Sequence, residues 1–323
     1  MATTTSITTS YAGEFGKKYI SAALLSASTI ENGGIEVKPN IKFKEVIKKI
    51  GTDAILKNAT CDFDPTSTVT LTEKVLTTKD LQVNLELCKK DFFSTWQAAE
   101  MGFSSFKTLP KSFADFVIAH VSDKVAANVE TAFWTGATGT SGSFDGISTL
   151  VALDAALPVA QEVTGTSVTA LNVVTELGKI VDAIPAALYG NPNLRIYVST
   201  NIAKAYVRAL GGFSTLSGSA GNVAPGTGVN NQSTQWYNNG SLSIDGVEIF
   251  WAPGLAVNTA IATTTDNLFF GTSILSDMNE VKVIDMSDVD GSQNVRVIMR
   301  MAGGAQYGVV EDIVTYGIVN SAN

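Results

Sequence analysis

The feature that most constrains this chain is a long amphipathic helix predicted over residues 112–134. Ser112 is a suitable N-cap, and Asp115 stands three residues later in the capping-box position. Apolar side chains then recur at steps of three and four residues, at Phe113, Phe116, Val117, Val121, Val125, Val129 and Phe133. Gly136 ends the helix, which would measure about 34 Å.

Residues 66–90 give the clearest strand pattern. Aliphatic side chains alternate with polar ones at a strict period of two, at Leu81, Val83, Leu85 and Leu87. A β-branched, polar run precedes them, and residues 77–80 resemble a turn between the two runs. We therefore expect a long two-stranded hairpin over 66–90. Because an isolated hairpin is marginally stable in water, it would need support from a neighbouring subunit.

The N-terminal part of the chain has little that could form a core. Residues 1–40 are rich in Thr and Ser and are interrupted by Gly33 and Gly34, so we expect an extended arm that orders only on another surface. Residues 41–57 alternate apolar and basic side chains, and the lysines in and beside this stretch are Lys38, Lys42, Lys44, Lys48, Lys49 and Lys57. This stretch is either a solvated amphipathic element or a face near other subunits and nucleic acid.

The second half mixes helices and strands, which predicts an α+β fold. Helices are expected at 169–188, capped by Thr169, and at 200–210, and a long irregular loop at 212–240. Strands are expected at 194–199, 242–244, 247–251, 268–270, 281–284, 295–301 and 309–316. Asp245-Gly246 is typical of a type I′ hairpin turn, and Asp290-Gly291 marks another turn.

Composition excludes several functional classes. The net charge of −8 argues against a tight, sequence-independent grip on nucleic acid, and only 16% of the residues are charged. A polar surface with few ions favours repeated subunit packing, because each buried contact desolvates few charges. The N-terminus lacks the pattern of a signal peptide, and no apolar run is long enough to span a membrane. Cys61 and Cys88 are expected to be reduced, partly buried thiols.

No catalytic, cofactor-binding or metal-binding constellation is predicted. His120 is the only histidine and lies within the long helix, which argues against a zinc site or a catalytic triad. A glycine-punctuated loop follows that helix at Gly136, Gly139, Gly142 and Gly146, but it lacks the lysine of a phosphate-binding loop. A connecting turn explains this loop better. We therefore predict that the protein is not an enzyme and carries no cofactor.

Two further clusters are assigned structural roles. Asp285, Asp288 and Asp290 precede Gly291 but lack the closing glutamate of a calcium loop, so a hairpin turn is the better interpretation. The tryptophans are not interleaved with basic residues, which favours core packing over base stacking, at Trp96, Trp134, Trp236 and Trp251.

The order of elements resembles the major capsid proteins of tailed phages, the Hong Kong 97 type of fold. The matching pieces are the arm, the hairpin of 66–90 as the family's extended loop, and residues 113–134 as its spine helix. The stretch FWTGATGTSGSFDGI, which ends in Gly146-Ile147, resembles the family's link to the axial domain. The stretch TTDNLFFGTSIL resembles its return to the peripheral domain.

The resemblance implies a division of the chain into an arm, an extended loop, a peripheral domain and an axial α/β domain. The expected boundaries are 1–60 for the arm, 61–92 for the extended loop, 93–150 plus 264–323 for the peripheral domain with spine helix 112–134, and 151–263 for the axial domain. Some relatives cross-link a loop lysine to an asparagine. Lys74 or Lys79 could occupy that lysine position, but no partner is identified.

The function implied by this resemblance is that of a major capsid protein. It would self-assemble through hexamers and pentamers into an icosahedral virion shell around double-stranded DNA, without binding the DNA sequence-specifically. Assembly in the host cytoplasm would involve separate scaffold and portal proteins and a possible decoration protein, and no membrane. The alternatives are an encapsulin-like compartment shell, a tail or decoration protein, or an α/β enzyme of unknown chemistry.

Overall fold

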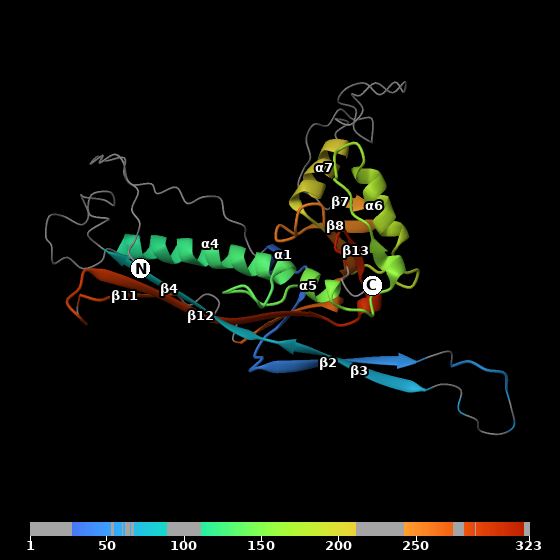
Figure 1. Ribbon diagram of the computed structural model, residues 1–323, viewed down its shortest axis with the longest axis horizontal. Coiled ribbons are helices and arrows are strands. Elements are labelled where there is room, and N and C mark those ends of the chain that lie inside the picture. Colours follow the sequence, from blue (N-terminus) through green and yellow to red (C-terminus); the bar gives the residue numbers. More distant parts are fainter. Residues whose placement is uncertain are drawn as a thin grey trace.

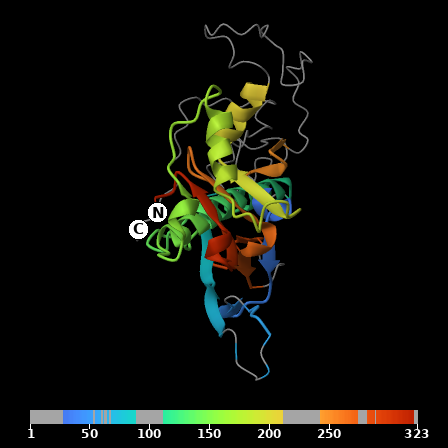
Figure 2. The same cartoon turned by 90° about the vertical axis from the view of Figure 1, so that its right-hand side faces the viewer.

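The computed structural model describes most of the chain. The described residues are 28–52, 55–59, 61, 65, 68–88, 111–210, 242–273, 281–287 and 289–319. The fold is mixed α+β, as predicted, and elongated (Figure 1). One long helix lies over a sheet, and a second sheet with two helices rises as a lobe at one end (Figure 1). A two-stranded hairpin projects on the side of the molecule away from that lobe (Figure 2). The irregular loop predicted over 212–240 lies outside the described residues.

The long helix, α4, spans Lys111–Thr135, which confirms the helix predicted over 112–134. The predicted N-cap is wrong, because Lys111 is already helical and Ser112 lies within the helix. It packs on a sheet in which β12 (Asn294–Tyr307) pairs with every other strand except β1. Those strands are β1 (Glu36–Lys38), β10 (Leu268–Thr272), β11 (Val281–Asp285) and β4 (Lys79–Cys88). Val117 and Val121 of α4 and Val297 of β12 form a buried apolar cluster between helix and sheet. This apolar contact holds the helix along the sheet.

The upright lobe contains the second sheet, in the order β5-β13-β9-β6-β8-β7. Its strands are β5 (Glu162–Val163), β13 (Val314–Tyr316), β9 (Ala260–Thr264), β6 (Leu194–Val198), β8 (Val247–Trp251) and β7 (Leu242–Ile244). Two helices, α6 (Val173–Asp182) and α7 (Thr200–Leu210), pack on it and on each other (Figure 1). The Asp245-Gly246 turn has two positive φ angles, 48° and 81°, so the predicted type I′ turn is confirmed.

The structure adds short helices and the strands β1, β5 and β9 to the predicted elements, and it shifts several boundaries. The short helices are α1 (Ser28–Glu31), α5 (Ile147–Ala152), η1 (Val159–Gln161), η3 (Thr265–Asn267) and η5 (Val310–Asp312). The helix predicted over 169–188 begins only at Val173, because Thr169 and Asn172 form a turn in which Asn172 Oδ1 accepts the Thr169 N–H at 2.7 Å. The same predicted helix ends at Asp182, and the strand predicted over 295–301 is extended to Asn294–Tyr307. The strand predicted over 309–316 is reduced to β13, since η5 precedes it.

The predicted hairpin over 66–90 is wrong. Its two halves are strands, β3 (Val69–Thr77) and β4, but they do not pair with each other. Instead β3 pairs antiparallel with β2 (Lys44–Thr52), whereas β4 pairs antiparallel with β12. Thr78 is the single residue between β3 and β4, and the chain continues through it nearly straight (Figure 1). The projecting hairpin therefore consists of β2 and β3.

The expectation of an arm over 1–40 also needs correction for its described part. Residues 28–41 are docked on their own chain, where β1 pairs in parallel with β10. Gly34 lies against the Phe250 ring, and its carbonyl accepts a hydrogen bond from the Tyr197 hydroxyl. Thr29 is fully buried. Residues 1–27 lie outside the described part of the chain.

A buried carboxylate joins three segments at the end of α4. Glu130 is 0% exposed; its Oε2 accepts the Thr29 N–H at 3.1 Å, and its Oε1 accepts the Trp134 indole N–H at 3.0 Å. The Thr29 hydroxyl also donates to Glu130, and the backbone of Gly254 approaches it. Burial raises the pKa of Glu130, although each of these hydrogen bonds favours the ionised form.

We predict that Glu130→Gln lowers the free energy of unfolding by about 1–3 kcal/mol, since an amide N–H would face donors that need an acceptor. A raised folded-state pKa means that the Glu130 contribution is fully present below pH 4.5 and is lost as pH rises through the folded value. The loss in the free energy of unfolding that Glu130→Gln causes should therefore be larger at pH 4 than at pH 8. Urea unfolding at both pH values measures it, with the exposed Glu36→Gln as the control; equal stability of the two variants would contradict the prediction.

Candidate functional site

Catalytic chemistry finds no support in the described residues. His120 is exposed on α4, and no group of three His, Cys, Asp or Glu in the described ranges could hold a metal ion. Asp285 and Asp290 cap the β11–β12 turn, where Asp285 Oδ1 accepts the Ser287 N–H at 3.0 Å and Asp290 Oδ1 accepts the Ser292 N–H at 2.9 Å. The hairpin interpretation of this stretch is therefore confirmed, except for Asp288, which is outside the described residues.

The glycine loop after α4 is a connecting turn, as predicted. Gly146 donates its N–H to the Gly136 carbonyl at 2.9 Å, which closes the loop and starts α5. Both glycines lie against backbone atoms, so neither position has room for a Cβ atom. Asp145 Oδ1 accepts the Thr138 N–H at 2.6 Å across the loop. These internal contacts explain the Gly146-Ile147 pair, because Ile147 is fully buried directly after the closing glycine.

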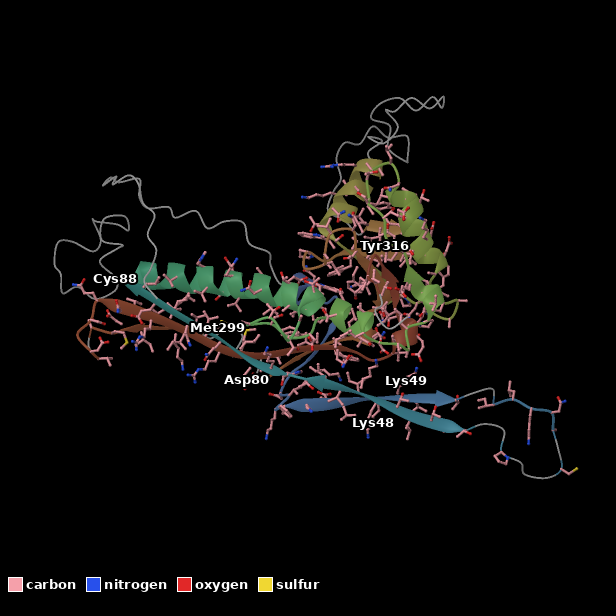
Figure 3. All side chains as sticks on the ribbon, in the orientation of Figure 1. Lys48, Lys49, Asp80, Cys88, Met299 and Tyr316 are labelled. Carbon is pink, nitrogen blue, oxygen red and sulfur yellow. The ribbon has the colours of Figure 1, made fainter. Side chains whose placement is uncertain are left out.

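The predictions for tryptophans and cysteines are confirmed only in part. Trp134 is fully buried in the core, whereas Trp251 is half-exposed and donates its indole N–H to the Thr200 hydroxyl at 3.0 Å. Trp96 and Trp236 are outside the described residues. Both cysteines are free thiols, Cys88 half-buried and Cys61 exposed. Cys88 lies at the end of β4 far from the hairpin (Figure 3), which explains why the two do not pair.

The candidate contact surface among the described residues is an exposed apolar face on the β2–β3 hairpin. The strand register places Val46 opposite Val75 and Ile50 opposite Leu71. Leu71 is 71% exposed and Ile50 is 69% exposed. These four residues, together with Val69, are called the outer face below. Exposed aliphatic pairs on a surface strand are typical of a protein–protein contact.

Two residues of opposite charge face each other between the two aliphatic pairs of the outer face. Lys48 stands opposite Glu73 in the ladder, midway between the rows of Val46 and Ile50. Neighbouring residues on a strand point to opposite faces, so Lys48 faces away from the body while Lys49 faces it (Figure 3). A partner surface on the outer face would therefore meet aliphatic side chains on both sides of two residues of opposite charge.

The opposite, inner face of the hairpin is polar and contacts the body. The Lys49 ammonium lies 2.6 Å from Glu311 Oε1. Lys74 pairs with Asp154 and donates to the Tyr307 hydroxyl at 3.0 Å, and Tyr307 in turn donates to Asp154 Oδ2 at 2.6 Å. The hairpin is thus tied to the body by two lysines that lie on the same face of the ribbon.

The carboxylates of the body that contact this inner face, Asp154 and Glu311, are held in their ionised form. Burial alone would raise the pKa of Asp154, but the hydrogen bonds from Lys74 and Tyr307 outweigh it and the pKa is lowered. In the same way, the hydrogen bond from Lys49 outweighs burial and lowers the pKa of Glu311. Burial and the adjacent Asp154 carboxylate raise the pKa of Tyr307, so its hydroxyl remains a donor. The inner face is thus a set of charge-assisted hydrogen bonds.

The root of the hairpin is its only apolar attachment among the described residues. Leu76 is fully buried and packs with Ile41 and Phe269, and Ile47 packs against this small cluster. At the junction with β4, the Thr78 N–H donates to the Phe43 carbonyl at 3.2 Å. Gly304 of β12 lies directly against the Thr77 carbonyl, where a Cβ atom would clash. These contacts fix where the hairpin leaves the body.

The two lysines considered for cross-linking lie near this root. Lys74 is engaged with Asp154 and Tyr307, and Lys79 donates to the Ser143 carbonyl at 2.8 Å. Both ammonium groups therefore bind their own chain, and neither lies at the projecting end of the hairpin.

Comparison with known proteins gives a fold. No family model and no curated protein matches the chain. A solved structure described as the capsid of a native GTA particle is 13% identical, with a TM-score of 0.60 over 94% of each chain. One from Gordonia phage Cozz is 16% identical, with a TM-score of 0.54 over 94% of this chain and 90% of that chain. One from Mycobacterium phage Adephagia is 13% identical, with a TM-score of 0.53 over 92% and 91%.

The chain has a capsid-like fold. At these identities the likeness concerns the fold alone, and it extends over nearly the full length of each partner. Among the described residues, no helix is long and apolar enough to cross a membrane. Sequence reasoning missed the outer face of this capsid-like fold, although the alternation in residues 41–57 and the β-branched run before Thr77 were signals for its two strands.

Proposed function

We propose that the chain is the major capsid protein of a tailed double-stranded DNA phage, with the Hong Kong 97 type of fold. The observation that carries this proposal is the outer face, which exposes aliphatic pairs on a hairpin that projects beyond the body. A two-stranded ribbon cannot bury both of its faces by itself. A neighbouring copy that covers this face would complete it, and repetition of that contact would build a shell. The capsid-like fold supports the proposal.

The strand pairing supports a revised domain assignment. In this proposal the extended loop consists of β2, β3 and the segment between them, in place of 61–92. The peripheral domain comprises α4 as its spine and the sheet of β1, β4, β10, β11 and β12, and the axial domain comprises α6, α7 and the sheet that contains β13. Compared with the expected boundaries, β1 and β4 therefore join the peripheral domain, and β13 leaves it. The arm is limited to the residues before α1, because residues 28–41 are docked on the body.

The role is structural, without catalysis or a cofactor, and the location is the virion. The partners are other copies in hexamers and pentamers, a separate scaffold and a portal protein, and a decoration protein on the finished shell. The shell encloses DNA without sequence-specific binding, which agrees with the net charge of −8.

The test is the solution mass and the shape of the purified full-length protein. We expect capsomer rings or closed shells, seen as megadalton particles by light scattering and as round particles in negative-stain micrographs. Co-expression with a scaffold protein from the same phage should raise the yield of closed shells. A subunit that stays at 34.0 kDa at high concentration, with and without that scaffold, would contradict the proposal. Shells that enclose a co-purifying enzyme would instead indicate a compartment.

A further inference from the structure

The β2–β3 hairpin is attached to the body mainly by polar contacts. Outward of Leu76 and Ile47, its aliphatic side chains are exposed, including Ile50, Leu71 and Val69. Apolar burial therefore fixes the root but not the direction in which the hairpin points. A two-stranded ribbon joined to a body only at its root can swing as a unit about that root. Its direction must come from contacts farther along the strands.

Two charged contacts lie along the inner face at increasing distance from the root. Lys74 stands opposite Ile47 in the ladder, and Lys49 stands opposite Thr72, two rows farther out. At about 3.4 Å per row, the second contact lies ~7 Å beyond the first. The Gln306 amide also donates to the Val75 carbonyl at 3.0 Å, close to the first contact. The direction of the hairpin is thus constrained at separate points along one face.

The acceptors come from three different places in the body. Asp154 follows α5, Tyr307 ends β12, and Glu311 lies in η5. The aromatic ring of Tyr307 also lies under the Lys74 ammonium, 4.2 Å from its centroid. Asp154 is held in turn by the Ala156 N–H, which donates to its Oδ1 at 3.0 Å. Because Asp154 is itself held by Ala156 and Tyr307, and the acceptors lie on separate elements, the lysines favour one orientation of the hairpin.

We propose that Lys49–Glu311 and Lys74–Asp154–Tyr307 form an ionic latch that sets the angle of the β2–β3 hairpin before it docks on a second copy of the chain. Within the proposed function these are positioning residues, since they do not lie on the outer face themselves. The latch aims that face at the neighbouring copy, and its release would let the hairpin swing about Thr78. The docking part of the inference rests on the proposed function, whereas the latch itself concerns a single subunit.

The test measures the hairpin direction in unassembled, full-length subunits. Spin labels are placed at Thr52→Cys, on the outer part of β2, and at Lys204→Cys, on α7, in a background with Cys61→Ser and Cys88→Ser. Double electron–electron resonance should show a single narrow distribution of distances between the two labels when the protein carries no further change. Lys49→Glu, which faces Glu311 and the adjacent Asp312, should shift the ratio of latched to released hairpin by about fivefold toward release.

A charge swap provides the rescue. The double variant Lys49→Glu with Glu311→Lys should restore the narrow distribution, because it rebuilds the pair with its signs exchanged. Asp154→Asn should broaden the distribution, and Asp182→Asn, the same change at the end of α6 away from the hairpin, should not. Added salt should broaden the distribution of the unchanged protein, since screening weakens partly exposed pairs.

The latch and its role in docking can fail separately. An unchanged distribution in Lys49→Glu and Asp154→Asn, or no recovery in the charge swap, would overturn the latch whatever the assembly result. Assembly is then followed by light scattering for the same variants. Slower assembly in Lys49→Glu with recovery in the swap supports the role in docking. If the distance distributions change as expected but every variant assembles normally, the role in docking alone is overturned.

Discussion

In the proposed capsid shell, replacing Leu71 by lysine is expected to prevent assembly while leaving the subunit folded. Leu71 lies on the outer face opposite Ile50, and both side chains are mostly exposed in the single subunit. Burial of a leucine against a neighbour contributes about 2 kcal/mol, and each 1.4 kcal/mol corresponds to about tenfold in affinity. A lysine removes that gain and places a charge in the contact, so the concentration needed for assembly should rise by well over tenfold.

The matched control is Leu71→Ile, which keeps the outer face apolar and should assemble nearly as the unchanged protein does. Light scattering and negative-stain micrographs measure assembly, and urea unfolding checks that the subunit remains folded. Leu71→Lys should lower the free energy of unfolding of the single subunit by only about 0.2–1 kcal/mol, because it loses the cross-strand pair with Ile50. Normal shells from Leu71→Lys would show that no neighbour covers the outer face.

A second large effect is expected from Gly146→Ala, which should severely destabilise the subunit. A Cβ atom at Gly146 would lie 2.5 Å from the Ala132 carbonyl oxygen and 2.7 Å from the Gly136 nitrogen. Both are backbone atoms at the end of α4, so no side chain can move aside to relieve the clash. The loop would open, and α5 with its buried Ile147 and Val151 would be displaced. We expect a loss of at least ~2 kcal/mol in the free energy of unfolding.

The control for this prediction lies in the same loop. At Gly139 a Cβ atom would meet nothing within 4 Å, and the φ angle is not positive, so Gly139→Ala should be neutral or slightly stabilising. Urea unfolding of the two variants and of the unchanged protein compares them directly. Similar stabilities for Gly146→Ala and Gly139→Ala would show that the closure of the loop against α4 does not stabilise the fold.

Local patterns in the sequence determined the elements whose structure depends on near neighbours. The helix α4 follows from apolar steps of three and four residues, and α7 begins and ends where its pattern does. The β7–β8 turn follows from Asp245-Gly246, because few other residue pairs adopt positive φ at both positions. In the same way, the spacing of Asp285, Asp290 and Gly291 indicated the turn between β11 and β12.

Only the tertiary structure decided which strands pair and which faces remain exposed. Alternation at a period of two predicts that a strand exists, but it does not name the strand's partner. Leu87 of β4 therefore gave no sign that it pairs with Val295, and Thr78 was interpreted as part of a turn although the chain runs straight through it. The outer face and the lysines of the inner face depend on that pairing. Partners distant in sequence are selected by packing and hydrogen bonds that form together, and no local pattern records them.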